Sequence, residues 1–259
     1  MSRLSSLPVQ LHAALMSRHL LKVIAGLTNL DAASVAQISR AAAGGGADLI
    51  DVACVPALVS LAASASGLPI CASAVDPELF PAAVAAGAAM VEIGNFDAFY
   101  PLGRRFGAEE VLALTRRTRQ LLPDVVLSVT VPHVLPLDQQ EQLAIDLAAA
   151  GADLIQTEGG TSARPFSAGA LGLIEKAAPT LAAAHAISRA LRSAGAPLPV
   201  LCASGLSAVT APMAIAAGAS GVGVGSAVNR LSDEVAMVAV VRSLREALAV
   251  AGAGAALAR

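Results

Sequence analysis

Three polar side chains recur at the same place in three apolar segments of the sequence, and their types suit proton transfer. Asp51, Glu92 and Gln156 each lie five residues after the glycine of a Gly–Ala pair, and Gly223 takes this place in a fourth segment. Alternate side chains of a strand share one face, so these groups are expected to point into the interior of a sheet. Buried carboxyl groups must be paired, hydrogen-bonded or protonated, and their altered pKa values suit acid–base catalysis. We therefore predict Glu92 and Asp51 as catalytic groups.

Lys22 gives these acids a second interpretation. It begins another apolar segment, and its ammonium group would pair with Asp51 or Glu92 in a purely structural polar plug. Lys22 is also a candidate catalytic residue, because a Schiff-base aldolase needs a desolvated lysine deep in its site. Its position near the start of a strand disfavours that chemistry unless the long side chain reaches upward. The other lysine, Lys176, lies in a long connection and is poorly placed for it.

Glycine and serine gather after the last three apolar segments and predict a site for a phosphate group. Glycine lets the backbone approach a ligand closely, and the start of a short helix directs free N–H groups at an anion. The alternative is that the glycines only allow close packing of the backbone. The residues concerned are Gly159, Gly160, Ser204, Gly205, Gly225 and Ser226.

Two further loops carry side chains that suit a site. His133 follows the fifth apolar segment, and the ordinary pKa of histidine suits proton transfer, so it is a candidate catalytic residue. A single loop histidine also commonly has a structural role. The loop after the fourth segment contains Arg104 and Arg105, which would either clamp an anionic substrate or remain solvated.

The elements that position these residues are eight short apolar segments that alternate with helical patterns. This alternation is typical of parallel βαβ units, and the continuous Val, Ile and Leu content suits strands covered on both faces. Helix N-caps are expected at Asp31, Asp76, Asp138 and Ser207, and left-handed glycines at the helix ends before four of the strands. The segments begin near residues 22, 49, 69, 89, 125, 153, 199 and 221.

The length of 259 residues fits one eight-stranded α/β barrel, which typically takes about 250. Cys71-Ala72-Ser73 recurs as Cys202-Ala203-Ser204, which suggests two related half-barrels with an insertion after the sixth strand. An open doubly wound sheet is the alternative. We predict a (β/α)8 barrel formed by residues 1–259 as a single domain, with an N-terminal helix near residues 8–20 that caps its base.

Composition argues against several classes of partner. Aromatic residues make up 2% of the chain, the net charge is −2, and no basic run occurs, so nucleic acid is not expected. No apolar stretch is long enough to predict a membrane span. The three cysteines form no C-x-x-C pair and no His/Cys cluster has ligand spacing, so no metal site is predicted. A homo-oligomer is compatible with the sequence.

Six runs of the sequence carry a family resemblance: KVIAGLTNLD, GADLIDVAC, ICASAVDPELF, VEIGNFDAFY, LSVTVPHVLPLDQQ and QTEGGTSA. With these runs the chain resembles a family of TIM-barrel proteins of unknown function from cyanobacteria and plastid genomes. This resemblance covers roughly residues 10–230 and implies a barrel in the cytoplasm or plastid stroma, but no reaction. The last third is more distantly similar to phosphate-binding barrels and to FMN-dependent barrels, in which this region holds the FMN phosphate. The chain lacks their basic residue facing the flavin.

Three functions follow as hypotheses. The first is an enzyme with isomerase- or lyase-type acid–base chemistry on a phosphorylated metabolite held at the loops after the seventh and eighth strands. The second is an FMN-dependent oxidoreductase that uses the same phosphate site, with FMN as its cofactor. The third is a barrel that binds a metabolite without catalysis.

Overall fold

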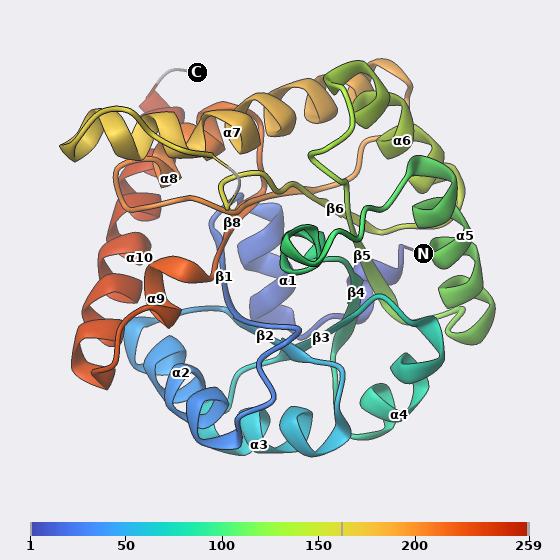
Figure 1. Ribbon diagram of the computed structural model, residues 1–259, viewed down its shortest axis with the longest axis horizontal. Coiled ribbons are helices and arrows are strands. Elements are labelled where there is room, and N and C mark those ends of the chain that lie inside the picture. The colour runs from blue at the N-terminus through green and yellow to red at the C-terminus, as the bar shows by residue number, and fades with distance from the viewer. Residues whose placement is uncertain (1, 162, 258–259) are drawn as a thin grey trace.

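The computed structural model describes residues 2–161 and 163–257, and places eight parallel strands side by side in a closed barrel (Figure 1). Each strand pairs with its neighbours in the sequence, and β1 pairs with β8 to close the ring. The predicted (β/α)8 fold is therefore confirmed, and the open sheet is wrong. The strands are β1 Leu20–Gly26, β2 Leu49–Ala53, β3 Ile70–Ala74, β4 Met90–Ile93, β5 Val126–Thr130, β6 Leu154–Gln156, β7 Val200–Ala203 and β8 Gly221–Val224.

Helices surround the strands because the outward side chains of each strand are apolar and need cover. The predicted insertion after β6 contains the long helix α7, which packs against β7 and lies between α6 and α8 (Figure 1). Among the described helices, none is apolar over a length that would cross a membrane. The helices are α1 Val9–Met16, α2 Ala32–Gly45, α3 Pro56–Ser66, α4 Phe80–Ala85, α5 Ala108–Leu121, α6 Leu137–Ala149, α7 Gly169–Ser193, α8 Ala211–Ala216, α9 Ser226–Asn229 and α10 Glu234–Leu257.

Two of the expected N-caps are confirmed and two are wrong. The side chain of Asp31 accepts a hydrogen bond from the backbone N–H of Ala33 at 3.0 Å, and Asp76 caps a short 3-10 helix in the same way. Asp138 lies within the first turn of α6, which begins after Pro136. Ser207 lies in a turn before Thr210, the residue that precedes α8.

The glycines that precede β2, β4, β6 and β8 adopt the expected left-handed backbone. Gly46, Gly87, Gly151 and Gly218 have φ values of 86°, 106°, 99° and 114°, a region that side chains with a Cβ atom disfavour. Each of these glycines turns the chain from a helix into the next strand, so they fix the register of the four even-numbered strands.

The N-terminal segment closes the bottom of the barrel, as predicted. Leu11 and Leu15 of α1, both 2% exposed, pack with Leu4 and Leu7 against the inward side chains at the first residues of the strands. This apolar layer separates the polar interior from solvent at the base, and all access to the barrel interior must therefore come from the other end. The strand residues of this layer are Leu20, Leu49, Cys71, Met90, Val126, Leu154 and Leu201.

We expect Leu11→Ala to lower the free energy of unfolding by about 2–5 kcal/mol, because it leaves a cavity under the barrel. Val9→Ala on the same helix is the control, since Val9 is 85% exposed and its change should be small. Urea denaturation followed by circular dichroism measures both. Equal effects of the two substitutions would show that α1 does not seal the base.

Candidate functional site

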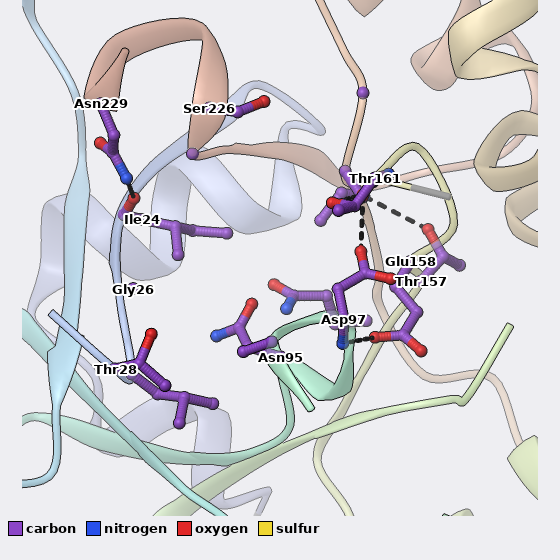
Figure 2. A pocket seen from close by; sticks show the side chains of 17 residues that line it. Ile24, Gly26, Thr28, Asn95, Asp97, Thr157, Glu158, Thr161, Ser226 and Asn229 are labelled. Atoms are coloured by element: carbon purple, nitrogen blue, oxygen red, sulfur yellow. Dashed lines mark hydrogen bonds between the residues drawn. The ribbon is translucent and has the colours of Figure 1, made fainter. Parts of the chain in front are cut away.

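A cavity of about 240 Å³ lies at the carboxyl ends of the strands, where chemistry is found in this fold. Residues from β1, β4, β6, β7 and β8 and their loops form its wall. Figure 2 shows Ser226 and Asn229 on one side of the cavity, with Asp97 and Glu158 on the opposite side. The predicted phosphate residues Ser204, Gly205, Gly225 and Ser226 all line it.

The predicted interior acids lie directly below this cavity in one hydrogen-bonded network. The ammonium group of Lys22 is 3.0 Å from Asp51 Oδ2 and 2.7 Å from Glu92 Oε2. It also donates to Gln156 Oε1 at 3.1 Å, while Gln156 Nε2 donates to Glu92 Oε1 at 2.6 Å. The side chains aligned in the sequence thus share one layer, and Lys22 joins them. Gly223, the fourth aligned residue, packs closely against β7, since a Cβ there would meet Ala203 Cβ at 2.9 Å.

Two serines complete the network from the odd-numbered strands. Ser73 donates a short hydrogen bond to Asp51 Oδ2, and Ser128 donates to Glu92 Oε2 at 2.7 Å. Burial lowers the pKa of Lys22, but the charges of Asp51 and Glu92 raise it by a larger amount. The net pKa is raised, so the side chain stays an ammonium cation. Burial and the charge of Asp51 raise the pKa of Glu92, more than Lys22 lowers it. The layer therefore holds a lysine cation against two acids that compete for it.

This network does not open into the cavity. Lys22, Asp51 and Glu92 are 0% exposed, and of the four linked side chains only Gln156 lines the cavity. The geometry is that of the polar plug considered from the sequence, with Lys22 paired to both acids instead of one. A catalytic role for these three residues requires that they act through Gln156, so they remain candidates as positioning groups.

A second acidic cluster lines the cavity itself, and it is centred on Glu158. Glu158 lies two residues after Gln156, so it belongs to the next inward layer, as the alternation of the strand predicts. Its Oε1 atom accepts hydrogen bonds from the backbone N–H of His133 at 3.1 Å and from the hydroxyl of Tyr100. His133 Nδ1 lies 3.1 Å from Glu158 Oε1 and 3.4 Å from Asp97 Oδ1. Four polar groups from three loops thus meet at one point.

Burial perturbs the titration of this cluster. It raises the pKa of Glu158, which is 4% exposed, and the neighbouring charge of Asp97 adds to the rise while His133 opposes it. Burial also lowers the pKa of His133, but its hydrogen bond to Glu158 and the charge of Asp97 outweigh this and raise it overall. The pKa of Tyr100 is raised by burial and by Glu158, so its hydroxyl stays protonated.

Two cavity residues have left-handed backbone although they are not glycine. Asn95 has φ 62° and Ser204 has φ 75°. Asparagine tolerates this conformation better than serine, and such residues concentrate at functional sites. In this conformation Ser204 Oγ donates to Asp97 Oδ2 at 2.9 Å and accepts from the N–H of Thr161 at 3.1 Å.

The glycines of the predicted phosphate loops serve different purposes. Gly160 and Gly205 are in backbone contact, since a Cβ on Gly160 would lie 2.3 Å from Gly205 Cα, so close packing explains this pair. Gly159 has φ 129° and packs against His133 and Pro179. Gly225 differs from them: a Cβ there would meet nothing closer than 3.4 Å. The missing side chain of Gly225 is not required by packing, and it enlarges the cavity beside Ser226.

Some side chains at this end were not identified as site residues from the sequence. Asp97 and Tyr100 are in the loop after β4. In the sequence, only the length and polarity of this loop indicated that it could contribute to a site. Arg104 pairs with Glu110 and stacks on the ring of Phe106, and Arg105 is exposed, so neither lines the cavity. The three cysteines are free and buried, as expected, and burial raises the pKa of each thiol.

Comparison with known proteins gives a family and a fold. Residues 4–252 match the family described as "Protein of unknown function (DUF561)". The chain is 41% identical over 231 residues to "Uncharacterized protein ycf23" of Cyanophora paradoxa, covering 89% of this chain and 93% of that protein. The resemblance stated from the sequence motifs is thereby confirmed.

Solved structures share the fold at low sequence identity. Thiamine phosphate pyrophosphorylase from Pyrococcus furiosus superposes with a TM-score of 0.58 at 16% identity, covering 92% of this chain and 98% of that one. A 3-hexulose-6-phosphate synthase superposes with a TM-score of 0.61 at 18% identity, covering 88% of this chain and 99% of that one. At these identities the likeness shows the barrel fold alone.

We expect Lys22→Met to lower the free energy of unfolding by about 3–5 kcal/mol at neutral pH, because two buried acids lose their cation. Glu92 takes up a proton more readily in the fold than its ordinary value of 4.5 allows, so the folded state gains stability as pH falls through the raised pKa. The loss should therefore shrink as the pH is lowered from neutral through the raised pKa of Glu92. Urea denaturation at several pH values measures this.

The control for that experiment is the triple variant Lys22→Met, Asp51→Asn, Glu92→Gln, which removes all three charges. It should recover part of the stability and lose the pH dependence. A single Lys22→Met variant as stable as the parent at every pH would contradict the role of Lys22 as the partner of both acids.

Proposed function

Because this chain belongs to the DUF561 family, whose description assigns no reaction, we propose its function from its own cavity. We propose that it is an enzyme that binds a phosphorylated small molecule and performs isomerase- or lyase-type chemistry on it. The phosphate would lie at Gly225 and Ser226, and the reacting part would lie beside Gln156 and Glu158, on the other side of the cavity.

The observation that carries this proposal is the gathering of unsatisfied polar atoms at the cavity. Four buried side-chain atoms lack a hydrogen-bond partner among the described residues, and three belong to residues that line the cavity. Asn95 Nδ2 is a donor, whereas Asp97 Oδ1 and Asn229 Oδ1 are acceptors. Leaving such atoms unpaired costs about 1–3 kcal/mol each, so their concentration in one place favours a polar ligand.

The position of the phosphate is supported by the backbone at the end of β8. Helix α9 begins at Ser226, directly after Gly225, and its first N–H groups have no partner within the helix. This place in the fold, after β7 and β8, often binds phosphate groups. The names of both structural neighbours contain a phosphate compound, which is consistent with the proposal but does not transfer a substrate to this chain.

The reacting end is defined by the carboxyl groups on the other side. Asp97 and Glu158 are the charged side chains of the described cavity wall. Isomerase and lyase reactions move a proton and develop charge on an oxygen atom, and they need polar groups fixed near both. The buried Lys22 network holds Gln156 rigidly beneath this end, which gives Lys22, Asp51 and Glu92 a positioning role.

The other hypotheses have less support. A cavity of about 240 Å³ lies below the range of roughly 300–1,000 Å³ that is typical for drug-sized ligands, which favours a ligand smaller than FMN. No described residue of its wall is a lysine or arginine that would face a flavin ring. A barrel that binds its ligand without catalysis predicts the same phosphate contacts, and the two experiments below separate it from an enzyme. Location in the cytoplasm or plastid stroma and homo-oligomerisation remain predictions.

The first test is a native mass spectrum of freshly purified protein, followed by calorimetric titration with a panel of phosphate esters. We expect Ser226→Asp to weaken binding of the best ester at least tenfold, because it places a negative charge at the anion corner. Ser60→Asp, on the outer helix α3, is the control and should bind as the parent does. Unchanged affinity in Ser226→Asp would remove the phosphate from this corner.

The second test follows proton exchange. We expect the parent protein to incorporate deuterium from solvent into the bound ester, and Glu158→Gln to do so at least about 100-fold more slowly. Proton NMR measures the rate, and calorimetry checks that the variant still binds. Asp146→Asn, outside the cavity on α6, serves as the matched control. Binding without any exchange in the parent would make the chain a metabolite-binding barrel instead.

A further inference from the structure

The described wall of the cavity carries negative charge without a lysine or arginine to balance it. Its wall includes two carboxyl groups, Asp97 and Glu158, but no lysine or arginine. Ser204 Oγ donates to Asp97, so this acid touches the loop expected to lie near the phosphate. Lys176 packs behind Gly205 and does not line the cavity. A phosphate dianion beside a carboxylate in a partly buried space is repelled, unless a positive charge lies between them.

We propose that Asp97, His133 and Glu158 bind a divalent first-row transition-metal cation, such as Mn²⁺ or Zn²⁺. The three side chains come from the loops after β4, β5 and β6, which the barrel brings to one point. Each side chain offers one donor atom, a ring nitrogen or a carboxylate oxygen, and these three atoms all lie within 4.8 Å of one another.

The separations of these donors fit one ion. His133 Nδ1 is 3.1 Å from Glu158 Oε1 and 3.4 Å from Asp97 Oδ1. Bonds of about 2.0–2.2 Å from one ion to nitrogen and oxygen place adjacent donors roughly 3.0–3.5 Å apart, in octahedral or tetrahedral geometry. The three side chains could therefore coordinate one ion without a large movement.

An unsatisfied acceptor is a second and independent observation. Asp97 Oδ1 is buried and has no hydrogen bond among the described residues, although Oδ2 of the same carboxylate accepts from Ser204. This oxygen lies 3.4 Å from His133 Nδ1. A buried carboxylate oxygen without a donor is a position where an ion or water is expected.

The donor set indicates the type of cation and what it would do. One imidazole and two carboxylates suit Mn²⁺, Fe²⁺ or Zn²⁺ better than Ca²⁺, which prefers oxygen ligands alone. Three protein ligands leave positions for water or substrate, as in catalytic sites. The ion would neutralise the acidic wall and attract an oxygen of the phosphorylated substrate. This second role rests on the proposed function, whereas cation binding itself does not.

The other acidic group of the barrel does not compete for this role. Asp51, Cys71 and Glu92 also lie close together, but the ammonium group of Lys22 already pairs with both acids at 3.0 and 2.7 Å. All three are buried below the cavity and are not part of its wall. Their cation is the lysine itself, and a metal ion there would add charge beside it.

The experiment is titration of chelator-treated full-length protein with Mn²⁺, followed by electron paramagnetic resonance. We expect one Mn²⁺ per chain, at least tenfold weaker binding in Asp97→Asn, and loss of the ¹⁴N coupling in pulsed spectra of His133→Asn. Asp138→Asn, an exposed acid on α6, is the matched control and should bind as the parent does. Circular dichroism shows whether each variant is folded. Zn²⁺ in competition with Mn²⁺ should displace it.

Two results would overturn the site: no Mn²⁺ or Zn²⁺ bound at millimolar concentration, or a bound ion whose spectra keep the ¹⁴N coupling in folded His133→Asn. Titration with inorganic phosphate, with and without Mn²⁺, then tests whether the bound ion attracts the phosphorylated substrate. Tighter phosphate binding with Mn²⁺ supports this second role of the ion. Equal binding refutes the second role and leaves the metal site intact. Phosphate binding without any metal binding would support the proposed function and reject this inference.

Discussion

The pairing of Lys22 with two acids is the interaction on which the interior of this barrel depends. An apolar barrel core does not accept two carboxyl groups unless a cation and hydrogen-bond donors accompany them. Lys22 supplies that cation from β1, and Gln156 connects it to the floor of the cavity. Because the base is sealed by an apolar layer, the polar network faces only one way, toward the cavity at the carboxyl ends of the strands.

The inward side chains form three layers that differ in polarity and burial. The lowest layer is apolar and excludes water, and the middle layer holds fully buried charges in fixed positions. The upper layer, which includes Glu158, lines the cavity, and of the linked side chains in the middle layer only Gln156 reaches it. A rigid, charged middle layer is a suitable support for groups that must keep their geometry during a reaction, because charged hydrogen bonds restrict side-chain movement.

The upper layer also explains why one fold can serve many reactions. The strands fix where each loop begins, whereas the loops after β4, β5 and β6 carry Asp97, His133 and the residues beyond Glu158. Changes in these loops alter the chemistry without disturbing the ring of strands. The family relationship therefore identifies the barrel fold, and the function must be established from the cavity of this chain.

The sequence alone indicated the eight strands, the base helix and the shared layer of Asp51, Glu92 and Gln156, because these follow from regular periods and from the Gly–Ala positions. It favoured a closed barrel over an open sheet, and the pairing of β1 with β8 decided this. Only the tertiary structure decided that Lys22 pairs with both acids below the cavity and that Asp97, Tyr100 and His133 meet Glu158 above it. These contacts join loops that have no period and side chains far apart in the chain. Their partners are set by barrel closure, which brings every strand end to one rim.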